Sequence, residues 1–183
     1  MNRFLSILTA IFMGVFFMAT ESQAQDLENT LYLELKDGRV VIEMMPEVAP
    51  KHVTRIKELV REGFYDGLIF HRVIPGFMAQ TGDPLGNGTG GSGQNLPAEF
   101  SDEKFTAGVL GMARSQDPNS ADSQFFIMFD NASHLNGSYT VWGRVVDGME
   151  NVNNIKKGSA RANGEIDGEP DKIVSMKVAA DVK

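Results

Sequence analysis

The residues with the most evident chemistry lie at 70–83, a stretch that reads FHRVIPGFMAQTGD. Arg72 lies in an apolar run that ends at a Pro-Gly break, and Phe77, Met78 and Gln80 follow within a few residues. A cation among hydrophobic residues costs free energy to desolvate. It therefore indicates either a functional site or an arginine whose stem packs on the sheet while its head reaches water.

The arrangement of side chains around Arg72 follows from strand geometry. If residues 70–74 form a strand, successive side chains point to opposite faces of the sheet. Phe70, Arg72 and Ile74 then share one face, and His71 lies on the other. The sequence therefore predicts that His71 and Arg72 do not act as a side-by-side pair.

Several kinds of chemistry are excluded by the residues that the chain lacks. It contains no cysteine, which rules out thiol catalysis and cysteine-bound zinc. Its histidines, His52, His71 and His134, come without the G-x-S-x-G elbow of a serine hydrolase. Residues 88–93 match G-x-G-x-x-G, but residues 94–97 read QNLP where a dinucleotide site needs a helix. The formal net charge of −7 argues against nucleic acid as a partner, because phosphate binding needs a basic patch.

The first residues have the features of a targeting segment rather than of the folded domain. Arg3 precedes an apolar stretch at 4–19, and residues 22–24 read SQA, which suits a signal peptidase. We predict a cleaved secretory signal at residues 1–24, with an uncleaved membrane anchor as the alternative. Residues 25–183 are then one domain that is periplasmic or secreted, with no membrane attachment after cleavage. Without disulfides, that domain must rely on its hydrophobic core.

Short strands dominate the predicted secondary structure. Alternating residues at 31–35 and 39–44 flank Lys36-Asp37-Gly38, which predicts a hairpin. Apolar residues at helical spacing predict a helix with Pro50 in its first turn and its end before Gly63. Further strands are predicted at 109–113, 124–128, 140–145 and 172–178, and a second helix at 149–155. Many short strands with few helices indicate a sandwich or barrel.

The order of these blocks resembles the cyclophilin family of peptidyl-prolyl cis-trans isomerases. The stretch 70–83 carries the clearest likeness, and it continues at 87–91, 111–113, 123–127, 135–137 and 141–145. The similarity extends from about residue 31 to residue 178, which is nearly all of the predicted mature chain. It implies a mainly β fold, a closed eight-stranded antiparallel β-barrel capped by two α-helices. It also implies isomerisation of X-Pro bonds with no metal and no cofactor.

The resemblance assigns roles to individual residues. The catalytic residues that it implies are Arg72, Phe77, Gln80 and Phe126. The substrate-binding residues that it implies are Ile74, Met78, Gly88, Ala113, Arg114, Gln124, His134, Leu135 and Tyr139. Arg114 is expected to contact a peptide through its backbone. The expected partners are proline-containing peptides and unfolded exported proteins, and a monomer is expected.

The chemistry that Arg72 offers suits this reaction. Rotation about an X-Pro bond crosses a barrier of roughly 20 kcal/mol. This barrier arises because the twisted amide loses its resonance, and no covalent bond has to break. A guanidinium stays protonated and can donate toward the prolyl nitrogen of a twisted amide. One such bond is worth about 1.5–3 kcal/mol, whereas an acceleration of about 10⁵ needs roughly 7 kcal/mol. A dry pocket that prefers the twisted amide must supply the rest.

Two residues depart from the family pattern at the rim of the expected pocket. His134 stands where many members have tryptophan, and Tyr139 stands where histidine is common. The resemblance therefore does not imply that this protein binds the cyclic peptide cyclosporin tightly. A non-catalytic peptide-binding or chaperone module on the same fold is the alternative function, although such a module would have no need of Arg72.

Overall fold

The structure is a computed structural model that describes residues 26–183. The predicted signal at 1–24 lies outside the described residues. Within 26–183, no helix is both long enough and apolar enough to cross a membrane.

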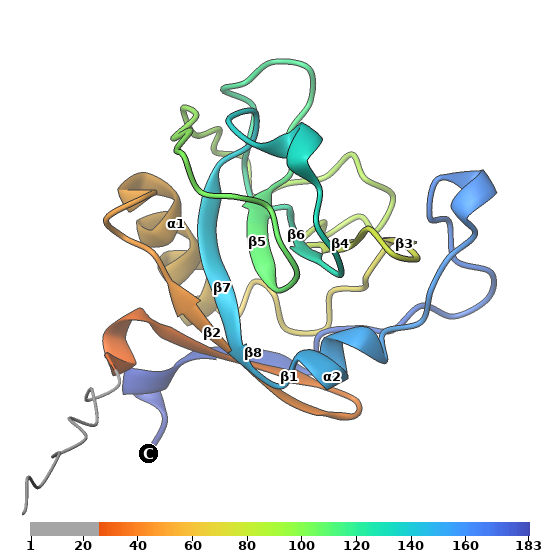
Figure 1. The fold of residues 1–183 in the computed structure, drawn as a ribbon. Coiled ribbons are helices and arrows are strands. Elements are labelled where there is room, and N and C mark those ends of the chain that lie inside the picture. Colours follow the sequence, from red (N-terminus) through yellow and green to blue (C-terminus); the bar gives the residue numbers. More distant parts are fainter. Residues whose placement is uncertain (1–25) are drawn as a thin grey trace, which may run out of the picture.

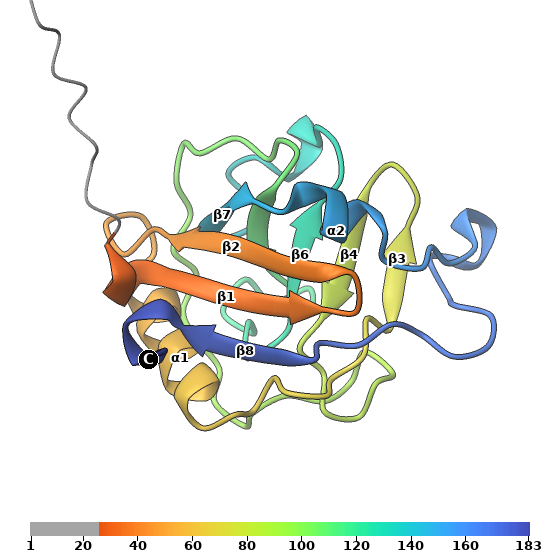
Figure 2. The same ribbon diagram turned by 90° about the horizontal axis from the view of Figure 1, so that it is seen from below.

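Eight antiparallel strands form one curled sheet with two helices (Figures 1 and 2). The strands are β1 (Thr30–Leu35), β2 (Gly38–Met44), β3 (Arg72–Ile74), β4 (Met78–Thr81), β5 (Val109–Met112), β6 (Phe125–Met128), β7 (Val141–Asp147) and β8 (Ser175–Val178). The helices are α1 (Pro50–Arg61), which packs beside β8, and α2 (Met149–Asn153), which packs beside β2. Across the sheet the strand order is β3-β4-β6-β5-β7-β2-β1-β8.

The sheet is an open half-barrel, so the prediction of a closed barrel is wrong on this point. Along the described chain, no ladder joins the edge strands β3 and β8. The segments before them are joined by the bridge between Ile69 and Lys172 and by a hydrogen bond from Gly67 N to Ile173 O. A loop occupies the outer edge of β3 instead (Figure 1). Val73 N donates to Gly164 O at 2.9 Å, and Gly158 N donates to Val73 O at 2.8 Å. These bonds use the backbone groups that β8 would need to close the barrel.

The predicted positions of the individual strands and helices agree better with the structure than the predicted closure of the barrel. The hairpin of β1 and β2 and the short strands β5, β6, β7 and β8 lie within a few residues of their expected positions. The predicted apolar face of α1 is buried, with Val53, Ile56 and Leu59 at most 1% exposed. The helix α2 is shorter than expected, and β4 is a strand that the sequence pattern did not locate separately.

The apolar side chains form two buried clusters. The larger one fills the space between the sheet and α1 and includes Phe125 and Trp142. The smaller one consists of Met45, Met78, Phe105, Phe126, Met128, Ala132, Leu135 and Val141. Since side chains alternate along β6, Phe125 enters the large cluster and Phe126 the small one. The small cluster forms the floor of the candidate site.

Candidate active site

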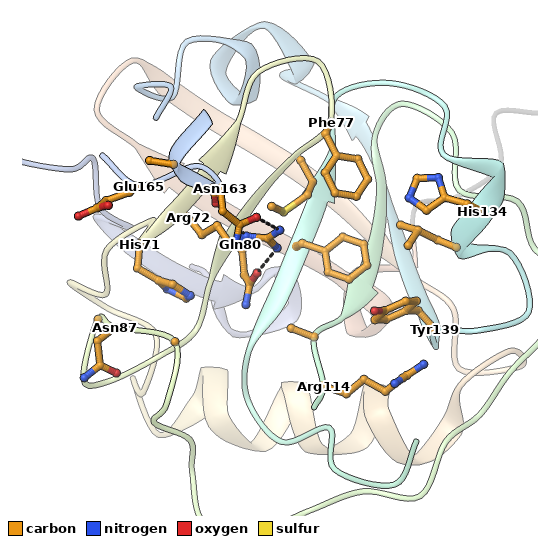
Figure 3. Close-up of a pocket in the computed structure, with 17 residues that line it drawn as sticks. His71, Arg72, Phe77, Gln80, Asn87, Arg114, His134, Tyr139, Asn163 and Glu165 are labelled. Atoms are coloured by element: carbon orange, nitrogen blue, oxygen red, sulfur yellow. Dashed lines mark hydrogen bonds between the residues drawn. The ribbon is translucent and has the colours of Figure 1, made fainter. Parts of the chain in front are cut away.

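A groove of about 890 Å³ lies over the small cluster, between β3, β4, β6 and the 3₁₀ helix Ser133–Leu135. Figure 3 shows Arg72 near its centre, with Phe77, His134 and Tyr139 toward one end and His71, Asn87 and Glu165 toward the other. Eleven of the thirteen predicted site residues line it: Arg72, Phe77, Met78, Gln80, Gly88, Ala113, Arg114, Phe126, His134, Leu135 and Tyr139.

One row across the sheet brings the central residues together. Arg72 on β3 lies opposite Gln80 on β4, and Gln80 lies opposite Phe126 on β6. Phe126 in turn lies opposite Gly111 on β5. A Cβ atom at Gly111 would collide with the Phe126 ring, so the glycine makes room for that aromatic side chain. Strand register therefore places a cation, an amide and an aromatic ring side by side.

Three hydrogen bonds to neutral groups hold the Arg72 guanidinium. Its Nη1 donates to Gln80 Oε1 at 3.1 Å. Its Nε donates to Asn163 O at 3.1 Å, and its Nη2 donates to Asn163 Oδ1 at 2.8 Å. Partial burial lowers the pKa of Arg72, but a guanidinium keeps its proton in proteins. The groove therefore contains a fixed positive charge whose three bonds are to uncharged acceptors.

A relay of amides fixes Gln80. Its Nε2 donates to Gln124 Oε1 at 2.9 Å, and Gln124 Nε2 donates to Gly90 O at 2.8 Å. This direction of bonds leaves Gln80 Oε1 as the acceptor for Arg72. Gln124 itself does not line the main groove; it lines a smaller neighbouring cavity of about 300 Å³.

The apolar end of the groove has the character of a pocket for a small ring. Met78, Phe126 and Leu135 are 1%, 5% and 8% exposed, so water has little access to its floor. Tyr139 packs edge-on against Phe126 with their ring centroids 5.8 Å apart. The ring centroids of Phe77 and His134 lie 5.6 Å apart. Such a floor desolvates an apolar ligand group next to the guanidinium.

The Arg114 side chain has a structural task that the sequence did not suggest. Its guanidinium lies 4.4 Å above the centre of the Tyr139 ring, and its Nη2 donates to Ser138 O at 2.7 Å. It therefore holds Tyr139 at the rim of the groove. The backbone N–H of Ala113 donates to Gln124 O at 2.9 Å, so that donor is already used.

The predicted alternation at 70–74 is wrong at its beginning, because β3 starts only at Arg72. Phe70 is fully buried in the large cluster, on the opposite side from Arg72, and His71 lines the groove. Both ring nitrogens of His71 are buried and have no hydrogen-bond partner within residues 26–183. Burial also lowers the pKa of His71, which favours the neutral ring. Along the described chain, no hydrogen bond joins His71 to Arg72, so the expectation that they do not form a pair remains.

Ile74 is the other predicted residue that does not line the groove. It packs against the small cluster, where a Cβ atom on Gly164 would approach its Cγ1 to 2.7 Å. The residues that the sequence analysis did not assign are His71, Gly86, Asn87, Ala162, Asn163 and Glu165. Asn163-Gly164 is a turn signal, but nothing in the sequence connects it to an arginine 91 residues earlier.

A buried carboxylate shapes the glycine-rich wall of the groove. Asp83 is 1% exposed and accepts hydrogen bonds from the backbone N–H groups of Leu85, Asn87 and Gly88. Burial alone would raise the pKa of Asp83, but these donors outweigh it and the pKa is lowered. The ionised carboxylate therefore fixes the loop that presents Gly88.

Comparison with known proteins gives a consistent result. The family described as "Cyclophilin type peptidyl-prolyl cis-trans isomerase/CLD" matches residues 30–178. A Brucella suis protein named "Probable peptidyl-prolyl cis-trans isomerase" is 54% identical over 191 residues, which cover 97% of each chain. The Bacillus subtilis "Peptidyl-prolyl cis-trans isomerase B" is 43% identical over 76% of this chain and 99% of that protein.

Solved structures agree with these relatives. A cyclophilin from Hirschia baltica is similar with a TM-score of 0.76 and 30% identity, over 86% of this chain and 76% of that one. A Cryptosporidium parvum cyclophilin, determined in the presence of the dipeptide Ala-Pro, is similar with a TM-score of 0.73 and 30% identity, over 81% of this chain and 98% of that one. With its fold and most of its length matched in this way, the chain belongs to the family of cyclophilin-type peptidyl-prolyl cis-trans isomerases.

Proposed function

We propose that this isomerase acts on X-Pro bonds in exported proteins that have not finished folding, and that Arg72 is its central catalytic residue. The observation that carries the proposal is the position of Arg72. Its protonated guanidinium is held by neutral acceptors beside a floor of Met78, Phe126 and Leu135. That arrangement joins a directed donor to a dry pocket, and prolyl rotation needs both.

The guanidinium retains donors for the substrate. Arginine has five N–H groups, and the three bonds to Gln80 and Asn163 use one each on Nε, Nη1 and Nη2. One N–H on each terminal nitrogen therefore remains. As the amide twists, the lone pair on the prolyl nitrogen localises, and a donor of this kind stabilises the twisted state more than either planar state. Gln80 acts in this scheme by holding Arg72.

The remaining residues have binding roles in the proposal. Phe77, Met78, Phe126 and Leu135 hold the prolyl ring, and Tyr139 and His134 form the rim. The Cryptosporidium parvum cyclophilin structure determined in the presence of Ala-Pro supports a proline-containing peptide as the ligand of this groove. We propose that the protein acts as a monomer, because one chain provides all of these residues.

The substrate class can be tested with a protein whose refolding is limited by prolyl isomerisation. We expect catalytic amounts of residues 25–183 to speed the slow refolding phase without changing the final native yield, because an isomerase lowers a barrier and leaves the equilibrium alone. Exchange in a short Ala-Pro-Phe peptide should accelerate in parallel. Tight peptide binding without faster exchange would support the alternative of a non-catalytic peptide-binding or chaperone module.

We propose a periplasmic or secreted location on the basis of the signal-like pattern of residues 1–24. We expect the protein isolated from its native cells to begin at Gln25 and to appear in the periplasmic or secreted fraction. Mass spectrometry of the intact protein in each cell fraction tests both the first residue and the location. A full-length chain in the membrane fraction would favour the uncleaved anchor, and a full-length chain in the cytosol would contradict export.

The residue at position 134 is expected to control affinity for cyclosporin. His134 lines the groove beside Phe77 but lacks the indole donor and the broad flat surface of tryptophan. We expect His134→Trp to strengthen cyclosporin binding by about tenfold, which corresponds to about 1.4 kcal/mol. Calorimetric titration of both proteins measures this. An unchanged dissociation constant would mean that another residue limits the affinity.

A further inference from the structure

We infer that Asn163 is a positioning residue for Arg72 and acts on the reaction only through that arginine. Two of the three hydrogen bonds that Arg72 donates go to Asn163, one to its backbone carbonyl and one to its side-chain Oδ1. Figure 3 shows Asn163 and Gln80 on either side of the guanidinium, joined to it by dashed lines. Asn163 thus occupies the Nε and Nη2 edge, while Gln80 holds Nη1.

The backbone of Asn163 has an unusual conformation that serves this contact. Its φ of 53° makes it the only non-glycine residue with positive φ within residues 26–183. Asparagine tolerates this left-handed region better than most residues, although the conformation still has a cost. In this conformation the carbonyl and the side chain of one residue both reach the same edge of Arg72. An uncommon backbone geometry that places two acceptors on one guanidinium indicates a functional constraint.

The loop around Asn163 is fixed to the strand that carries Arg72. Gly164 O accepts from Val73 N at 2.9 Å, next to Arg72 in the chain. Within the loop, Gly164 N donates to Ser159 O at 2.8 Å and Ser159 N donates to Glu165 O at 2.9 Å. Because the loop and β3 share these bonds, the two acceptors of Asn163 keep a defined place relative to Arg72.

The geometry separates positioning from general structural support. Asn163 is exposed and contributes nothing to either buried cluster. Its side-chain acceptor is an amide oxygen, so it orients the guanidinium without cancelling the charge. Removal of Oδ1 would leave the planar group held at Nη1 by Gln80 and at Nε by a carbonyl. The guanidinium would then sample orientations in which its free N–H groups miss the prolyl nitrogen.

The test uses Asn163→Gly, which keeps the carbonyl, removes Oδ1 and suits a positive φ. We expect kcat for an Ala-Pro peptide to fall about tenfold, the effect of one lost hydrogen bond to a charged group. KM and the thermal unfolding midpoint should stay close to the wild-type values. In nuclear magnetic resonance spectra, the Nη2–H signals of Arg72, which lose their acceptor, should exchange with water faster in the variant, whereas the Nε–H signal keeps its carbonyl acceptor. Arg161→Ala, an exposed change in the same loop, should alter none of these quantities.

A double-mutant cycle decides whether Asn163 acts through Arg72. In an Arg72→Ala background, we expect Asn163→Gly to have no further effect on kcat, because its target is already absent. An equal tenfold loss in that background would overturn the inference, since Asn163 would then act on the substrate directly. Wild-type kcat in the single variant, or a loss that merely follows the fraction of folded protein, would also overturn it.

Discussion

Arg72→Ala is expected to lower kcat/KM for an Ala-Pro peptide by about 10²–10³-fold, the range found when one preorganised donor to a transition state is removed. The loss should exceed the value of a single hydrogen bond, because the charge lies beside a floor of low exposure where its field is weakly screened. The fold should survive, since Arg72 lies outside both buried clusters. Line-shape analysis of cis and trans peptide resonances measures the exchange rate.

Two companion variants make this result specific. Arg161→Ala removes an exposed arginine from the neighbouring loop and should leave the rate unchanged. Arg72→Lys keeps a charge but has no planar fork, so it cannot bond to Gln80 and Asn163 together while still donating to the substrate. We expect it to resemble the alanine variant. An alanine variant that kept more than a third of wild-type activity would remove Arg72 from the centre of the mechanism.

The site residues were predicted from the resemblance to the family, and short-range geometry explains why the structure brings several of them together. Arg72 and Gln80 are eight residues apart on two strands joined by a turn at Gly76, whose φ is 69°. A hairpin of that length places the two side chains opposite each other. Alternation also placed Gln124, just before β6, and Phe126 on one face, although only Phe126 lines the main groove. The floor residues Met78, Phe126 and Leu135 were predicted from the order of the blocks that resemble the family.

The part that could not be predicted depends on contacts between distant segments. Asn163 meets Arg72 only because its loop occupies the outer edge of β3. That same loop explains the open sheet, since it takes the backbone groups of β3 that closure would use. His71 lines the groove because β3 begins at Arg72, two residues later than the alternation suggested, so His71 lies outside the strand. In each case the position of the residue depends on a long-range hydrogen bond or on a strand boundary, and no local sequence pattern predicts either.

The second large effect concerns stability in acid, and it depends on a buried pair remote from the groove. His52 is fully buried at the start of α1, and its Nδ1 lies 2.7 Å from Glu99 Oε2. The same carboxylate accepts from the backbone N–H groups of Lys51 and His52. Ala49 provides no side-chain cap for α1, so Glu99 takes that role from a distant loop. His52 Nε2 is buried without a hydrogen-bond partner among residues 26–183.

Both groups of this pair are expected to destabilise the protein as the pH falls. Burial lowers the pKa of His52, and the bond to Glu99 opposes this only in part. Burial tends to raise the pKa of Glu99, but its bonds to His52 and Lys51 lower it overall. The unfolded chain therefore takes up protons that the folded chain resists. The stabilisation is fully present above about pH 6.5, the ordinary value for histidine, and is lost as the pH falls from there through the lowered pKa of the folded His52. The part that comes from Glu99 is lost below about pH 4.3, the ordinary value for glutamate, as the pH falls through the lowered pKa of the folded Glu99.

Glu99→Gln should expose this contribution directly. The amide can still accept from α1, but it has no charge, so we expect the free energy of unfolding at pH 7 to fall by about 2 kcal/mol, within the range for bonds to charged groups. Between pH 7 and pH 4, the loss of stability that begins near pH 6.5 should become steeper, because the amide no longer opposes the burial that lowers the pKa of His52, whereas the further loss near pH 4 should become shallower, because Glu99 no longer titrates. Urea unfolding across that pH range measures both effects. Glu103→Gln is the matched control, because the Glu103 carboxylate has no hydrogen bond or ion pair in the described part of the chain. If Glu99→Gln unfolds with the same stability and the same pH dependence as that control, the carboxylate does not hold the start of α1, and the acid sensitivity must come from other groups.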